Sequence, residues 1–253
     1  MSSSSRHETF GPVSHHSHAL LTSQRRNPDA PSDLHHDPNI FGPSEYSITE
    51  KSEIHPAVPA IVAIGVSTGG PTALEQILPL FPSDFPIPIL IVQHMPSGFT
   101  APFAERLNMI CSITVREATQ QQTLQPAVAY IAPAGSHMRV VHSITRGEPI
   151  LLLDFHRGNA LHMPSIDLLM KSVAEVYRNR AIGVIMTGMG HDGANGIAAI
   201  YKEGGLTIGQ NEATCAVYSM PRACAEAGVL TKITSLARIP AEIIRAAYNS
   251  RRE

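Results

Sequence analysis

The chain has 253 residues, of which 43% are hydrophobic and 16% charged, and its formal net charge is -2 at pH 7. This length and apolar content suffice for one large or two modest domains, and the near-neutral charge provides no basic surface for nucleic acid as a partner. The apolar runs fall short of the roughly 20 residues that span a bilayer, and no signal-peptide layout is present, so we expect a cytoplasmic protein that is not a membrane protein.

Residues 1–57 form a low-complexity segment that is rich in Ser, His and Pro and has no sustained hydrophobic period. We predict that this segment is disordered. Its histidines, among them His15, His16 and His18, raise adventitious metal binding as an alternative, but a simple polar tail is the interpretation that we favour. Residues 58–253 are predicted to form the folded domain.

Deletion of residues 1–55 is expected to leave the melting temperature within about 5 degrees of that of the full chain. The reason is that this composition buries too little apolar area to offset the entropy of ordering the segment. Differential scanning calorimetry of both proteins is the measurement. A fall of more than about 10 degrees would mean that the segment packs on the domain.

Beyond residue 57, short apolar runs alternate with segments of helical period. The pattern predicts strands near 60–66, 87–93, 128–132, 182–187 and 206–209, and helices near 71–79, 99–108, 166–177, 193–203 and 239–248. Such alternation is typical of parallel strands joined by helical crossovers. Residues 136–154 differ, because two β-like runs flank the turn signal "TRGEP". The sequence therefore predicts an α/β fold, a doubly wound and mostly parallel sheet, with an antiparallel hairpin that joins it and makes it mixed.

Three polar residues lie at or shortly after the ends of predicted strands. Ser67 follows the first strand, His94 the second and Asp192 the fourth. The carboxyl ends of parallel strands share one edge of a sheet, and ligands of open α/β sheets bind at that edge. A serine, a histidine and an aspartate brought together there are the parts of a nucleophile, its base and the group that orients the base.

Each of the three residues also has a structural interpretation. Ser67 and Asp192 are good N-cap residues for the helices that follow them, and His94 is compatible with a packed histidine at a strand end. Glycines flank both Ser67 and Asp192, at Gly65, Gly69, Gly70, Gly188, Gly190 and Gly193. Because glycine permits close backbone approach, this environment favours an exposed nucleophile and an oxyanion site.

The glycine-rich turn does not match the nucleotide-binding motifs. The spacing at 65–70 breaks the G-x-G-x-x-G dinucleotide fingerprint, and no lysine between Lys51 and Lys171 completes a phosphate-binding loop. The turn fits the short G-x-S-x-G pattern of a nucleophile elbow, but the chain order of serine, histidine and aspartate disfavours an ordinary α/β-hydrolase. Cys111, Cys215 and Cys224 are far apart, so we predict reduced structural thiols and no metal site.

From residue 60 to about 235, the chain resembles the catalytic domain of CheB-type protein-glutamate methylesterases. Six segments carry the resemblance, in this order along the chain: "IGVSTGGP", "QHMPSGFTAPFAERLN", "AYIAPAGSHM", "MPSIDLLMKSVAE", "GVIMTGMGHDGANG" and "TIGQNEATCAVYSMPRACAEAG". The resemblance places the family's catalytic serine, histidine and aspartate on Ser67, His94 and Asp192. It also implies a doubly wound α/β sheet with an antiparallel hairpin.

The resemblance implies hydrolysis of γ-glutamyl methyl esters, and deamidation of glutamines, on the cytoplasmic domains of methyl-accepting chemoreceptors, without a cofactor. Backbone N–H groups at Thr68, Gly69 and Met189 are candidates for the oxyanion and substrate site. Met95, Met163 and Met189 are candidates to line a pocket for the receptor helix, although core packing is the commoner role of methionine.

Two departures from the family pattern bear on control and substrate. Only about 57 residues precede the domain, roughly half the length of the family's phospho-receiver, so we expect a stand-alone form without that switch. Near "HMPSID", Leu161 and Met163 stand where basic residues often flank the histidine, which predicts altered receptor contacts. A repurposed, non-catalytic binding module in a signalling complex is the alternative to an esterase.

Overall fold

The structure is a computed structural model that describes residues 60–145 and 147–249. The predicted low-complexity segment and its boundary at residue 57 lie outside the described residues. The described part belongs to one compact unit of the chain.

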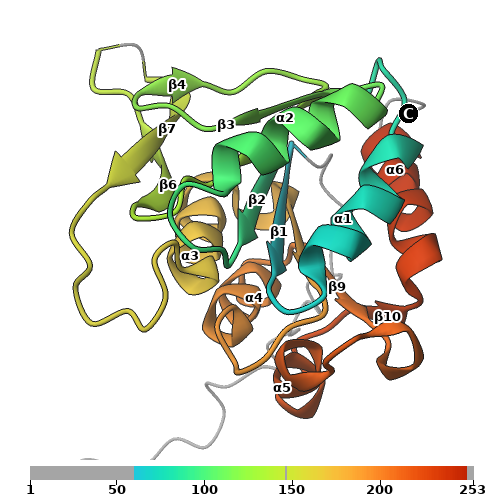
Figure 1. Ribbon diagram of the computed structural model, residues 1–253. Helices are drawn as coiled ribbons and strands as arrows, with labels where there is room; N and C mark the ends of the chain where they lie inside the picture. Colours follow the sequence, from blue (N-terminus) through green and yellow to red (C-terminus); the bar gives the residue numbers. More distant parts are fainter. Residues whose placement is uncertain (1–59, 146, 250–253) are drawn as a thin grey trace, which may run out of the picture. The chain divides into compact units, whose positions relative to one another are not determined.

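A seven-stranded sheet forms the centre of this unit (Figure 1). Its strands stand in the order β10-β9-β8-β1-β2-β5-β3, and every neighbouring pair is parallel. The strands are β1 (Ile61–Val66), β2 (Ile89–Gln93), β3 (Thr114–Glu117), β5 (Val128–Ile131), β8 (Ala181–Ile185), β9 (Leu206–Gln210) and β10 (Lys232–Thr234). The chain builds outward from β1 on one side and then returns to the other side of β1 with β8.

Helices cover both faces of the sheet and bury it on both sides. In β1, Val62 and Ile64 enter one core cluster, whereas Ile61 and Ala63 enter another, as the two-residue period of a strand requires. The first cluster includes α1 (Gly70–Ile77), α2 (Thr100–Ile110) and α6 (Ile239–Asn249); the second includes α3 (Ile166–Tyr177), α4 (Ala194–Lys202) and α5 (Ser219–Glu226). Burial on both faces is why these strands read as continuous apolar runs.

The predicted hairpin is present, but the prediction that it makes the main sheet mixed is wrong. Strands β6 (His137–His142) and β7 (Pro149–Asp154) pair antiparallel, and β4 (Gln122–Thr123) joins them in a separate three-stranded sheet. Met138, Val140, Leu151 and Leu153 of this hairpin pack into the core cluster that contains α3. The hairpin therefore packs its apolar face on the domain instead of pairing its backbone with an edge strand.

The five predicted strands and five predicted helices are confirmed, with ends that shift by no more than two residues. The elements that the pattern missed are β3, β4, β10 and α5. The three strands have two to four residues and include exposed positions, so they show no apolar run. Helix α5 carries a proline in its first turn. Short 3-10 turns occupy Leu78–Leu80, Arg178–Arg180, Glu212–Thr214 and Leu236–Arg238.

The direction in which the chain adds strands reverses beside β1. Because the connections from β1 and from β8 leave in different directions, the loops after these two adjacent strands diverge at the carboxyl edge. Ser67 lies in the first loop and Asp192 in the second, and His94 follows β2 on the other side of β1.

Candidate active site

Ser67 lies in the tight turn between β1 and α1. Its backbone N–H donates to the Thr187 carbonyl over 3.0 Å, and its carbonyl accepts from the Gly70 N–H over 2.9 Å. The N-cap residue of α1 is Gly69, at φ 80°, and no side chain caps this helix. The N-cap interpretation of Ser67 is therefore wrong, and its hydroxyl is available for another contact.

The hydroxyl of Ser67 lies 3.2 Å from Nδ1 of His94, and Nε2 of His94 lies 2.9 Å from Oδ2 of Asp192. The side chains of His94 and Asp192 are only 9% and 12% exposed, so water screens their contact little. The structure thus brings together the three residues that the sequence places at strand ends.

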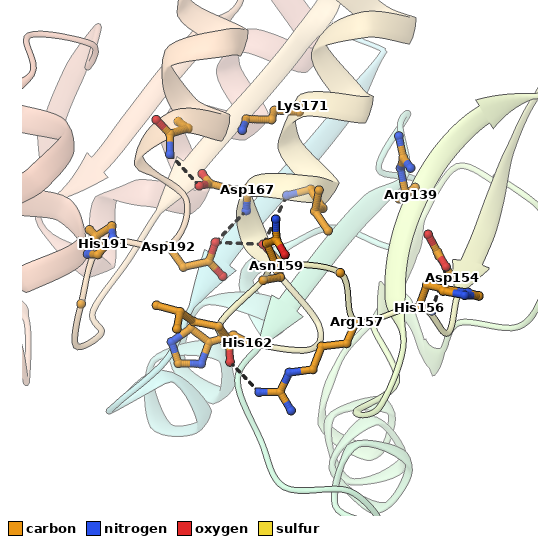
Figure 2. Close-up of a pocket in the computed structure, with 17 residues that line it drawn as sticks. Arg139, Asp154, His156, Arg157, Asn159, His162, Asp167, Lys171, His191 and Asp192 are labelled. Carbon is orange, nitrogen blue, oxygen red and sulfur yellow. Dashed lines mark hydrogen bonds between the residues drawn. The ribbon is translucent and has the colours of Figure 1, made fainter. Parts of the chain in front are cut away.

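The Asp192 carboxylate sits at the N-terminus of α3 (Figure 2). Its Oδ2 accepts from the Ile166 N–H over 2.8 Å, and its Oδ1 accepts from the Asp167 N–H and the Ser165 hydroxyl, both over 3.0 Å. Burial alone would raise the pKa of Asp192, but the hydrogen bonds from His94 and from these backbone groups outweigh burial and lower the pKa to about 2. Asp192 is therefore ionised and can only accept hydrogen bonds.

The tautomer of His94 follows from that charge. Because the carboxylate cannot donate, Nε2 carries the ring proton, and Nδ1 is left as an acceptor for the Ser67 hydroxyl. His94 is thus oriented with its basic nitrogen toward the serine.

Asp192 caps α3 and not the helix that follows it, so the predicted cap of α4 is corrected. The N-terminus of α4 is instead held by Asp167, whose Oδ1 accepts from the N–H groups of Gly193 and Gly196 over 3.0 and 2.7 Å. The N-terminus of α3 is thus bound by a carboxylate from the loop before α4, and the N-terminus of α4 by a carboxylate from the first turn of α3. This reciprocal capping fixes the Asp192 loop against the core.

Buried polar side chains hold the loops that carry Ser67 and His94. The Nε2 group of Gln93 donates to the carbonyls of Ser67 and His94 over 3.0 and 2.9 Å. The Thr187 hydroxyl donates to the Thr68 carbonyl over 2.9 Å and accepts from the Val217 N–H over 3.0 Å. Sequence reasoning missed these residues, although Gln93 directly precedes His94.

A second histidine, also missed, stacks on His94. The ring centroids of His94 and His162 are 4.2 Å apart, and the ring planes differ by 18°. Burial, and then the nearby His94, lower the pKa of His162, so its ring is neutral at pH 7. The sequence signal that points to His162 is the segment "HMPSID", of which it is the first residue.

The three oxyanion candidates lie in the loops around Ser67. Thr68 and Gly69 follow it directly, and Met189 lies in the loop after β8 with 72% of its surface exposed. Among the described residues, no hydrogen-bond acceptor is found for the backbone N–H groups of Thr68, Gly69 and Met189. Met95, by contrast, packs against the core cluster on the α1 and α2 face.

Gly188 allows the β8 loop to approach Ser67. A Cβ atom at this position would lie 2.2 Å from Sδ of the buried Met220 and 2.8 Å from Cβ of Ser67. Gly188→Ala is therefore expected to lower the free energy of unfolding by about 1–3 kcal/mol and to displace Ser67 from His94. Urea denaturation measures the first effect, and the rate at which an acylating reagent modifies Ser67 measures the second.

Gly204→Ala is the matched control for Gly188→Ala. Gly204, at φ +82° in the loop between α4 and β9, is also strained by a side chain but lies away from the three residues. We expect it to lower stability by about 1 kcal/mol and to leave the rate unchanged. An unaltered rate in Gly188→Ala would contradict the close approach.

The arrangement is suited to acyl transfer through a serine nucleophile. A hydroxyl, a base with its acceptor nitrogen turned toward that hydroxyl, and a buried carboxylate behind the base follow one another within hydrogen-bond distance. Within residues 60–145 and 147–249, no group of three His, Cys, Asp or Glu side chains is placed to bind a metal ion. The three cysteines are free, and burial raises the pKa of each thiol, that of Cys224 to about 12.

Comparison with known proteins identifies the relatives of this chain. The family model described as CheB methylesterase matches residues 62–243. A protein from Nitratidesulfovibrio vulgaris, named protein-glutamate methylesterase/protein-glutamine glutaminase 2, is 46% identical over 188 residues, which are 74% of this chain and 51% of that protein. A protein of the same function name from Archaeoglobus fulgidus is 44% identical over 191 residues, 73% of this chain and 52% of that protein.

A solved structure shares the fold. The crystal structure of the Thermotoga maritima CheB methylesterase catalytic domain matches with a TM-score of 0.71 and 36% identity, over 75% of this chain and 99% of that one. The chain spans about half the length of the curated relatives it matches.

Proposed function

The chain belongs to the CheB methylesterase family, and from this premise we propose that it hydrolyses γ-glutamyl methyl esters of proteins, with Ser67 as nucleophile, His94 as base and Asp192 as the residue that orients the base. The observation that carries the proposal is the unbroken contact from Ser67 Oγ through the His94 ring to Asp192. Deamidation of glutamine side chains is proposed as a second reaction of the same site.

The first half of the reaction acylates the serine. Nδ1 of His94 accepts the Ser67 proton while Oγ attacks the γ-carbonyl carbon, and the charge that develops on the carbonyl oxygen is stabilised by backbone N–H groups of Thr68, Gly69 or Met189. The resulting imidazolium is stabilised by Asp192 through Nε2. It then donates the Nδ1 proton to the methoxy oxygen, and methanol leaves.

The second half restores the enzyme. A water molecule gives a proton to Nδ1 of His94 and attacks the glutamyl-serine ester, and the returning proton releases Ser67. The products are a glutamate side chain and the free serine. For a glutamine substrate the leaving group is ammonia in place of methanol, which is why one site serves both reactions.

We propose the cytoplasmic domains of methyl-accepting chemoreceptors as the protein substrates, on the basis of the family to which the chain belongs. No helix in the described part of the chain has the length and apolar character needed to cross a membrane. No cofactor enters the proposed reaction.

Methanol release from a methylated receptor cytoplasmic domain tests this function. The purified chain is incubated with receptor whose glutamates carry labelled methyl groups, and volatile label is counted over time. Receptor that was never methylated, incubated in the same way and analysed for ammonia, reports glutamine deamidation. No methanol above a protein-free blank would contradict the proposed esterase.

A further inference from the structure

A cleft lined by charged side chains begins beside Asp192 and His162 and extends along α3 to the β6–β7 hairpin (Figure 2). Its volume is about 530 Å³. Three permanent cations line it from three elements: Arg139 from β6, Arg157 from the loop after β7, and Lys171 from α3. We call this the cationic cleft.

Three carboxylates, those of Asp154, Asp167 and Asp192, also line the cleft and balance the formal charge of these cations, but their hydrogen bonds go to other groups. Asp192 and Asp167 are bound by the N-termini of α3 and α4, and Asp154 accepts from the backbone N–H of His156 over 2.9 Å. Within the described residues, no ion pair joins Arg139, Arg157 or Lys171 to an acidic side chain.

These cations also have N–H donors that are available to a ligand. The Nε group of Arg139 is buried and has no hydrogen-bond partner in the described part of the chain, so it is free to donate to an acceptor of a ligand. Arg157 donates from one amino group to the Leu161 carbonyl over 3.1 Å. Lys171 is exposed on α3.

We propose that the cationic cleft binds acidic side chains of the substrate protein that lie near the reacting glutamyl residue. This inference rests on the proposed function, because it assigns the cleft to the same substrate. The enzyme would then prefer a methyl ester that stands in an acidic sequence over one in a neutral sequence, since each flanking carboxylate gains a cation.

Two observations favour a polypeptide over a small phosphate-like anion. The backbone N–H groups of a helix N-terminus are the usual phosphate donors, but those of α3 and α4 are already taken by Asp192 and Asp167. Leu161, 76% exposed, also lines the cleft, and such an apolar neighbour suits an amphipathic segment of protein.

Two matched peptides test the proposal. Each has one central glutamyl γ-methyl ester, and the flanking positions are Glu in one peptide and Ser in the other, because glutamine would itself be a substrate of the proposed deamidation. Methanol release gives kcat/KM for both. Binding is measured separately by fluorescence anisotropy on versions with norleucine in place of the ester. We expect the wild-type chain to prefer the acidic peptide by about tenfold at low salt in both assays, and the preference to shrink at high salt.

Lys171→Gln and its control Lys202→Gln test whether the cationic cleft causes the preference for the acidic peptide. Lys202 ends α4, is exposed and does not line the cleft, so its replacement changes the net charge equally. We expect Lys171→Gln to reduce the acidic preference about threefold, with the neutral peptide unaffected, and Lys202→Gln to keep the full preference. Arg139→Gln provides a second variant with the same expected loss.

An acidic preference that is absent in the wild type, or equal in wild type and Lys171→Gln, would overturn the proposal. Competition by inorganic phosphate below about 1 mM would overturn it in favour of a small-anion site. A binding preference without methanol release would support the cleft and contradict the proposed esterase, so the two failures are distinguishable.

Discussion

Ser67→Ala is expected to reduce methanol release by a factor on the order of 10⁴ to 10⁶, close to the uncatalysed background. The substitution removes the only atom proposed to form the acyl intermediate. His94→Ala is expected to cost nearly as much, because without Nδ1 nothing accepts the serine proton. The double variant should lose at most about threefold more than either single one, since residues that act as one unit are not additive.

The free energy of unfolding distinguishes the proposed role of Ser67 as nucleophile from a structural role. Its hydroxyl caps no helix, so Ser67→Ala should change the free energy of unfolding by less than about 0.5 kcal/mol. Urea denaturation of both proteins is the measurement. A folded Ser67→Ala protein that releases methanol at the wild-type rate would contradict the proposed nucleophile.

Asp192→Asn is expected to lower both the rate and the stability, because Asp192 contacts both His94 and the N-terminus of α3. An amide can donate to Nε2 and so permits the tautomer that protonates Nδ1, which then cannot accept from Ser67. In a serine protease triad this change costs on the order of 10⁴-fold, and we expect a loss of at least about tenfold here.

The stability effect of Asp192→Asn should depend on pH. The pKa of Asp192 is lowered from 3.8 to about 2 in the folded chain, so its ionised form stabilises the fold by roughly 2 kcal/mol above pH 3.8. This contribution is lost as the pH falls toward 2, and about half of it is gone at pH 3. Urea denaturation of wild type and variant between pH 7 and pH 3 should therefore show a gap that narrows with acid.

Glu175→Gln is the control for the charge change. Glu175 is exposed on α3, the helix whose N-terminus Asp192 binds, and makes none of the contacts to His94 or to that N-terminus. Glu175→Gln should retain the wild-type rate, and its free energy of unfolding should change between pH 7 and pH 3 as that of the wild type does. A gap for Asp192→Asn that stays constant down to pH 3 would contradict the ionised-carboxylate account.

Much of this architecture follows from local patterns. The central strands are buried on both faces, so their apolar runs are unmistakable, and the rule that ligands bind at strand ends selects Ser67, His94 and Asp192. The resemblance to the family selects the same residues. The 3.2 and 2.9 Å contacts between them depend on the sheet order, which no local pattern contains.

The remaining features depend on contacts between distant segments. Residues 136–154 have the pattern of a hairpin, but that pattern does not reveal whether the hairpin pairs with the sheet or packs on α3. For Asp192, the prediction that it caps the following helix is wrong, because its carboxylate binds the N-terminus of α3, which begins 26 residues earlier in the chain. The stacking of His162 on His94 likewise joins two loops that sequence spacing does not relate.

The reciprocal capping couples the starts of α3 and α4. If α3 moves away from the start of α4, the amides of Ile166 and Asp167 lose Asp192 as their acceptor, and Gly193 and Gly196 lose Asp167. Helices α3 and α4 also share one core cluster. The two helix starts and the acidic residue therefore belong to a single cooperative unit, in which amide exchange at all four positions requires the same rare fluctuation. The contact between Asp192 and His94 therefore depends on the integrity of this half of the domain.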